Sequence, residues 1–190
     1  TAFIFISSNI FSQALIPNPP EVSASSYLLL DAKTLTVISS SKADQSTGLA
    51  SITKIMTTYV VADQISKGFI SLDTLVDISV ACWKMEGSKM FIREGTKVSV
   101  SDLLKGIIIQ SGNDASCALA EKIAGSQSAF ADLMNNYAEK LDLLDTNFVN
   151  PTGLPDVNHY STANDIAKLS IRLIEDFPNS YDLFKEKEFT

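Results

Sequence analysis

The hydrophobic residues of this chain change their spacing along its length, from short extended runs to the three- and four-residue intervals of helices. Two runs rich in Leu, Val and Ile flank Asp31-Ala32-Lys33 within the segment SSYLLLDAKTLTVISS, and they predict a β-hairpin. From Ser51 to about Lys67 the apolar residues recur on one helical face instead. They are Ile52, Ile55, Met56, Tyr59 and Val60. The pattern therefore predicts a hairpin followed by a helix.

Further helices are expected after this one, because each later apolar stretch of helical spacing is bounded by capping or turn residues. In chain order they run from Ser101 to about Gln110, from the turn at Ser111-Gly112-Asn113 to Gly125, from Ser126 or Ser128 to about Leu141, and from Thr162 to just before Pro178. The stretch 81–98 has no clean period and predicts a loop or a small hairpin. Residues 146–161 predict a second loop.

These elements predict one domain of mixed α/β (α+β) class. Two strands alone form a marginal sheet, so the hairpin needs strand neighbours that the helices do not supply. We expect residues 26–190 to be part of a domain with a helical block and an antiparallel sheet, of which this stretch holds only the first hairpin. The remaining strands are expected beyond Thr190.

The first 14 residues, TAFIFISSNIFSQA, form a short apolar run that ends in small residues. Ser12 and Ala14 match the pattern of a secretory cleavage site. We therefore interpret residues 1–14 as a truncated signal peptide, with residues 15–25 as the extended start of the mature protein. The alternative is a buried N-terminal strand.

Composition excludes several kinds of partner. The 45% hydrophobic and 19% charged residues suit a globular protein with a packed core. A net charge of −7 argues against nucleic acid, whose phosphates require a basic face. The single histidine, His159, has no His or Cys nearby in the sequence, so no metal or other cofactor is expected.

Three residues with reactive or bulky side chains are expected to be structural. His159 is interpreted as a surface or loop histidine, and Trp83 as a core residue. Cys82 and Cys117 are expected to be two separately buried thiols, with a disulfide as the alternative if the fold brings them together.

Ser51 and Lys54 are candidates for a nucleophile and its base. A serine hydroxyl is a poor nucleophile until a base takes its proton. Three residues apart on a helix, Ser51 Oγ and Lys54 Nζ share one face and can form a hydrogen bond. Lysine can act as a base near neutral pH only if its pKa is lowered, by burial or by a second cation. An ordinary core helix remains the alternative, since Ser39 and Lys42 have the same spacing.

Ser111-Gly112-Asn113 supplies a second polar group, in a turn between two apolar helices. Such a turn can hold its side chains rigidly toward a cleft, where Ser111 would relay a proton and Asn113 would offer an amide to a substrate peptide group. Taken alone, these three residues are more often just a turn between helices. Their occurrence after a Ser-x-x-Lys helix start favours a shared active site.

Several stretches of the chain together resemble the D-alanyl-D-alanine carboxypeptidases among the low-molecular-mass penicillin-binding proteins. They are ASITKIMT from Ala50, GSKMFIREGTKVSVSDLLKGIIIQSGNDA from Gly87, AGSQSAFADLMN from Ala124 and NPTGLPDVNHYSTANDIAKL from Asn150. The similarity runs from about residue 27 to residue 190. It implies the fold of serine β-lactamases and penicillin-binding proteins. On this resemblance Ser51 is the acylated nucleophile, Lys54 its general base, and Ser111 and Asn113 the second active-site motif.

The resemblance also implies a substrate, an inhibitor class and a location. The expected reaction removes the terminal D-alanine from peptidoglycan pentapeptides through a Ser51 acyl-enzyme, in the periplasm or on the outer face of the bacterial inner membrane. β-Lactam antibiotics are expected to acylate the same serine. No cofactor is implied. The alternatives are a non-catalytic penicillin-binding sensor and, less favoured, a class A β-lactamase, which would have Asp in place of Gly112 and a deacylating Glu near residues 145–149.

Two further parts of the family pattern are expected beyond Thr190. They are a Lys-Thr-Gly motif on a sheet strand and a C-terminal β-domain with an amphipathic membrane anchor. The strand would supply an amide of the oxyanion hole, and removal of one such donor costs about 100–1000-fold in rate. Residues 1–190 by themselves are therefore expected to release no D-alanine.

Overall fold

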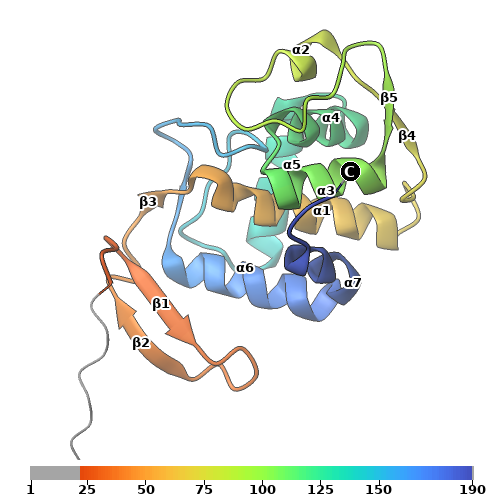
Figure 1. The fold of residues 1–190 in the computed structure, drawn as a ribbon. Helices are drawn as coiled ribbons and strands as arrows, with labels where there is room; N and C mark the ends of the chain where they lie inside the picture. Colours follow the sequence, from red (N-terminus) through yellow and green to blue (C-terminus); the bar gives the residue numbers. More distant parts are fainter. Residues whose placement is uncertain (1–21, 190) are drawn as a thin grey trace, which may run out of the picture.

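The computed structural model describes residues 22–189 and shows a block of helices with a hairpin at its edge (Figure 1). The predicted signal peptide and most of the predicted mature N-terminus lie outside the described residues. The hairpin consists of β1 (Tyr27–Leu30) and β2 (Val37–Ser41), which pair antiparallel. The Asp31 carboxylate organises its turn, accepting hydrogen bonds from the backbone N–H groups of Lys33 and Thr34 at 3.0 and 2.7 Å. The hairpin prediction is confirmed.

The helix predicted from Ser51 is present and runs through the middle of the helical block. A 3₁₀ turn, η1 (Ala50–Thr53), leads directly into α1 (Lys54–Ser66). The sequence predicted a single apolar face, but every residue from Met56 to Ala62 is buried. The helix is buried around its circumference because other helices pack against it from several sides.

The remaining predicted helices are also present, and three short elements that were not predicted accompany them. In chain order these elements are α2 (Val80–Trp83), α3 (Val100–Gln110), α4 (Asn113–Ala124), α5 (Gln127–Lys140), α6 (Ala163–Asp176), α7 (Pro178–Tyr181) and a 3₁₀ turn η2 (Asp182–Lys185). The three that were not predicted are α2, α7 and η2. Ser126 and Thr162 cap their helices as expected. Ser101 is not a cap, because Ser99 accepts the hydrogen bond from the Asp102 N–H two residues earlier than predicted. None of the described helices is long and apolar enough to cross a membrane.

Two further pairs of short strands fix the loops around the helices. β3 (Thr47–Gly48) pairs with β6 (Tyr160–Ser161), and β4 (Leu75–Asp77) pairs with β5 (Lys97–Ser99), both antiparallel. The first pairing holds the predicted loop 146–161 against the start of η1. The second closes a long loop: only Lys97 and Val98 of the stretch 81–98 belong to a strand, and their partner β4 lies before that stretch. After the end of α2 the stretch is mainly a loop, which was one of its two interpretations, and not a hairpin of its own.

The core consists of two clusters of buried side chains that meet along α1. One contains Met56, Tyr59 and Val60 of α1 together with side chains of α5, α6 and the loop that follows α5. The other contains Val61 with side chains of α3, α4 and the β4–β5 pair. Because α1 contributes to both clusters, the position of its first turn is fixed from two sides.

A disulfide joins Cys82 of α2 to Cys117 of α4. The expectation of two separate thiols was wrong, because α2 packs on α4 and brings together residues 35 positions apart. The interpretation of Trp83 as a core residue was also wrong. Since Cys82 points inward, its neighbour Trp83 faces outward and is 40% exposed.

Removal of the disulfide is expected to lower the free energy of unfolding by about 2–4 kcal/mol, because the unfolded chain regains the freedom of a long loop. Urea denaturation of the oxidised protein and of the Cys82→Ala/Cys117→Ala double variant, each with and without dithiothreitol, measures this. Only the parent should respond to the reductant. Two free thiols at these positions in the unreduced, unfolded protein would contradict the pairing.

Candidate active site

The amine of Lys54 lies at the centre of the candidate site. Its Nζ is 3.3 Å from Ser51 Oγ, 2.8 Å from Asn113 Oδ1 and 2.7 Å from the carbonyl oxygen of Thr152. The side chain is buried, and all three neighbours are uncharged. The structure therefore places two other candidate residues, Ser51 and Asn113, and a third group that was not predicted around the nitrogen atom of Lys54.

Burial lowers the pKa of Lys54 from 10.5 to about 8. A buried ammonium loses its hydration, and the neutral acceptors around it replace only part of that stabilisation. From the sequence, a lowered lysine pKa could have two causes, burial or a second cation. At Lys54 the cause is burial. Roughly a tenth of the amine is then unprotonated at pH 7, far more than for a lysine with an ordinary pKa.

The backbone before Ser51 is held in an uncommon conformation. Ala50 has a φ of 45°, in the left-handed region that residues other than glycine rarely adopt. The chain then enters the 3₁₀ turn, which leaves Ser51 exposed while Lys54 points inward. Backbone strain of this kind persists only where the surrounding structure enforces it. Here the buried side chain of Leu49 anchors the preceding residue.

Ser111 lies where α3 ends and the chain turns into α4. It caps α3 with a φ of 54°, again in the left-handed region. A small pocket of about 90 Å³ between α1 and α3 is lined by Ser51, Lys54 and Ser111, with Phe184 of η2 on its rim. The turn predicted from Ser111-Gly112-Asn113 therefore places Ser111 in the lining of the same pocket as the Ser51–Lys54 pair.

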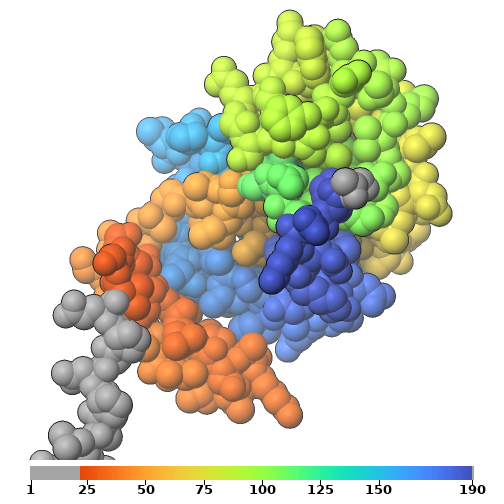
Figure 2. Space-filling model, in the orientation of Figure 1, coloured from red at the N-terminus to blue at the C-terminus, as the bar shows by residue number. Residues whose placement is uncertain are grey.

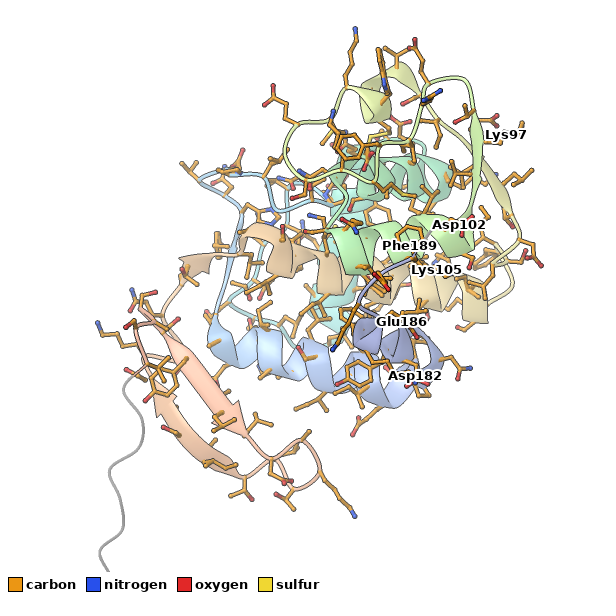
Figure 3. All side chains as sticks on the ribbon, viewed as in Figure 1. Lys97, Asp102, Lys105, Asp182, Glu186 and Phe189 are labelled. Carbon is orange, nitrogen blue, oxygen red and sulfur yellow. A yellow bond between two sulfur atoms is a disulfide. The ribbon has the colours of Figure 1, made fainter. Side chains whose placement is uncertain are left out.

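The C-terminal segment passes over this side of the molecule (Figure 2). Figure 3 shows Phe189 of this segment beside α3, and Phe189 lines a second pocket together with Gln110 of α3. From the C-terminal segment, Phe184 lines the candidate site itself.

The side-chain amide of Asn113 is engaged within the protein at both ends. Its Oδ1 accepts from Lys54, and its Nδ2 donates to the Glu86 carbonyl oxygen at 2.7 Å. The backbone N–H of Asn113 also donates to the Ser88 carbonyl oxygen at 2.7 Å. Asn113 thus orients the lysine and is itself held by the loop after α2.

The sequence did not reveal Thr152, whose contribution is a backbone carbonyl. The turn that carries it is closed by Asn150, whose Oδ1 accepts from the N–H groups of Thr152 and Gly153 at 3.0 and 2.7 Å. The turn is fastened to α1 a second time, because Thr57 Oγ1 donates to the Pro151 carbonyl oxygen at 2.7 Å. Every residue has a backbone carbonyl, so the identity of residue 152 could not mark it as an acceptor for Lys54. The Asn-Pro-Thr-Gly composition does predict the turn.

Asp114 was also missed. It is completely buried, and its carboxylate accepts from the backbone N–H groups of Met90 and Ile92 at 3.0 and 3.2 Å. It therefore fastens the loop after α2 to the start of α4, beside Asn113. An acidic residue in the first turn of an otherwise apolar helix is the sequence signal that could have identified it.

The other candidates from the sequence are not part of this site. Ser39 is in the hairpin, where its Oγ lies 3.4 Å from the Tyr27 hydroxyl, and Lys42 is exposed. His159 belongs to a loop as expected but is buried, with 3% of its surface exposed, so its interpretation as a surface residue was wrong. Among the described residues, Cys82, Cys117 and Glu121 form a cluster with metal-ligand spacing. Its two sulfurs are joined in the disulfide and are not available as thiolates.

The arrangement around Lys54 is suited to removing a proton from Ser51. A neutral amine has two N–H groups and one lone pair. If Asn113 and Thr152 accept the two N–H groups, the lone pair is left to face Ser51 Oγ. The site can therefore generate a serine alkoxide for attack on an acyl group.

Comparisons with known proteins agree with this chemistry. The sequence model of the D-alanyl-D-alanine carboxypeptidase family (peptidase family S11) matches residues 13–190. D-alanyl-D-alanine carboxypeptidase DacC of Escherichia coli K12 is 42% identical over 197 residues, which cover 100% of this chain and 49% of the relative. DacA of Haemophilus influenzae is 41% identical over 175 residues, which cover 90% of this chain and 44% of the relative.

Solved structures give the same picture of the fold. Penicillin-binding protein 5 of Haemophilus influenzae superposes with a TM-score of 0.88 at 40% identity, over 92% of this chain and 52% of that one. The chain spans about half the length of the curated relatives it matches. The fold class expected from the sequence, that of penicillin-binding proteins, is confirmed.

Gly153 is predicted to be irreplaceable at the contact between the Thr152 turn and η1. Its φ is 85°, and a Cβ there would overlap the carbonyl group of Ala50. Gly68 is a matched control with a φ of 75° and no atom within 4 Å of an added Cβ. Both Ala variants incur about 1–2 kcal/mol of left-handed strain. Overlap should cost Gly153→Ala about 1–3 kcal/mol more.

Urea denaturation of the two Ala variants beside the parent measures the difference. Equal destabilisation of the two variants would show that Gly153 does not pack against Ala50 as described.

Proposed function

This chain belongs to the D-alanyl-D-alanine carboxypeptidase family, and we propose that the protein containing it is a serine-type carboxypeptidase that removes the terminal D-alanine from peptidoglycan pentapeptides. The observation that carries the proposal is the placement of Lys54 Nζ, 3.3 Å from Ser51 Oγ and in contact with two neutral acceptors. The names of the relatives support the choice of substrate.

In the proposed reaction Ser51 is the nucleophile and Lys54 its general base. Lys54 takes the Oγ proton as the Oγ–C bond forms at the carbonyl carbon of the penultimate D-alanine. The C–N bond to the terminal D-alanine then breaks, and the leaving amine receives a proton from Lys54 through the hydroxyl of Ser111. Water hydrolyses the resulting ester and restores Ser51, so one water is consumed for each D-alanine released.

The proposal extends to ligands and location. Asn113 would donate its second amide hydrogen to a carbonyl of the substrate. β-Lactams present an acyl group to the same serine and would form a slowly hydrolysed ester. Substrate in the cell wall implies an exported protein in the bacterial periplasm, with a membrane anchor outside residues 1–190, as the family resemblance led us to expect.

One alternative from the sequence, a class A β-lactamase, has little structural support. A Cβ at position 112 would lie 3.0 Å from Asp114 Oδ1 and 3.1 Å from the Gly106 carbonyl oxygen. Both atoms are acceptors, so an Asp side chain at this position would meet crowding and repulsion. On the opposite side of Lys54 the loop presents the Thr152 carbonyl and not a carboxylate. A non-catalytic penicillin-binding sensor remains the second candidate, because it would use the same nucleophile.

The proposal predicts one penicilloyl adduct on Ser51 and release of D-alanine from a pentapeptide. Intact-mass and peptide-mapping analysis after benzylpenicillin, on the protein as its gene encodes it, tests the first part. Ser51→Ala should abolish the adduct, since no hydroxyl remains to be acylated. Ser39→Ala is the matched control, because Ser39 also precedes a lysine by three residues, and it should retain the adduct.

A D-alanine assay on the same samples separates enzyme from sensor. Release that depends on Ser51 supports the carboxypeptidase. An adduct without release would identify a sensor, and a folded protein with no adduct on Ser51 would contradict both.

A further inference from the structure

His159 is a buried titratable group that the proposed reaction does not use. Its Nδ1 accepts a hydrogen bond from the Val149 N–H at 3.1 Å, and its Nε2 lies 2.7 Å from Thr53 Oγ1. Because Nδ1 acts as an acceptor, the neutral ring carries its hydrogen on Nε2 and donates it to Thr53. The ring of Phe148 packs edge-on against the imidazole, with centroids 5.7 Å apart.

Both hydrogen-bond partners of His159 lead to Lys54. Thr53 directly precedes Lys54 in the chain and is fully buried. Val149 directly precedes the Asn150-closed turn, whose Thr152 carbonyl accepts from Lys54 Nζ. The imidazole therefore connects the start of α1 to the turn that holds one of the lysine hydrogens.

We propose that His159 is a positioning residue for Lys54, which in its neutral form ties the Thr152 turn to the start of α1 and on protonation loses this tie. A protonated imidazole has N–H groups on both nitrogens. Its Nδ1–H would then point at the Val149 N–H, and two donors cannot bond. Separation of Val149 from the ring leaves the bond from Thr57 to the Pro151 carbonyl in place but shifts the Thr152 carbonyl relative to Lys54, so the lysine lone pair is directed less well at Ser51.

The surroundings of the ring favour the neutral form at neutral pH. Burial lowers the pKa of His159, and the charge of Asp156 opposes this shift to a smaller extent. Lys54 directly follows Thr53, the residue that contacts the ring, but its amine is directed toward Ser51, Asn113 and Thr152. Protonation of His159 is therefore expected only below the ordinary pH range of a histidine.

This inference about His159 rests on the proposed function. It is tested by measuring how the rate of Ser51 acylation by benzylpenicillin depends on pH. With Lys54 alone titrating, the logarithm of the rate should fall with a slope of about one below its pKa. Protonation of His159 adds a second step, so the slope should steepen to about two at acid pH. Rapid quench followed by intact mass measures these rates, and circular dichroism over the same range monitors folding.

Two substitutions of His159 separate its two contacts. In His159→Asn, the amide oxygen takes the place of ring Nδ1 and can accept the hydrogen bond from the Val149 N–H. In His159→Gln, the amide nitrogen takes the place of ring Nε2 and can donate a hydrogen bond to Thr53. We expect His159→Gln to be about 10- to 100-fold slower than the parent near neutral pH, and His159→Asn to recover most of that loss. Both variants should lose the steep acid step.

Asp156→Asn is a third variant that leaves the ring in place. Removal of the carboxylate removes the charge that favours the protonated ring, so the steep step should move to lower pH. A steep acid step that persists in both His159 variants, or equal rates for Asn and Gln, would overturn the inference while leaving the proposed function intact. A parent that is not acylated at any pH would instead refute the proposed function, and the inference with it.

Discussion

A neutral amine has two hydrogens and one lone pair, and the candidate site depends on where each of them points. Asn113 and Thr152 offer one acceptor each to Lys54, and Ser51 Oγ occupies the third direction. Both acceptors are uncharged, so they orient the amine without stabilising its protonated form as a carboxylate would. Burial then brings the pKa of Lys54 to about 8. Orientation and basicity therefore have separate structural causes.

Much of the surrounding fold can be understood as support for those two acceptors. The disulfide and the buried carboxylate of Asp114 hold the loop after α2 against α4, where Asn113 is bonded to Glu86 and Ser88. On the other side, the Asn150-closed turn is fastened to α1 through Thr57. Because α1 is packed into both core clusters, it cannot shift to follow a movement of the loop that holds Asn113 or of the turn that carries Thr152. A small displacement of either segment would therefore change the geometry at Lys54.

Local chemistry was readable from the sequence, whereas contacts between distant segments were not. The Ser51–Lys54 spacing, the caps at Ser126 and Thr162 and the turn at Ser111 depend on neighbours within a few residues. The Thr152 carbonyl acts through the backbone and has no residue signature. The Cys82–Cys117 bond and the burial of His159 depend on packing between segments 35 and 106 residues apart, so composition alone misplaced both.

The most direct test of this account is the pKa of Lys54 itself. An NMR titration of selectively labelled lysine side chains, with the Lys54 signal assigned by its loss in Lys54→Arg, would report that value in the folded protein. The account predicts a midpoint near 8. A midpoint near the ordinary lysine value of 10.5 would contradict it, because Lys54 would then remain an ammonium ion at neutral pH and could not take the proton of Ser51.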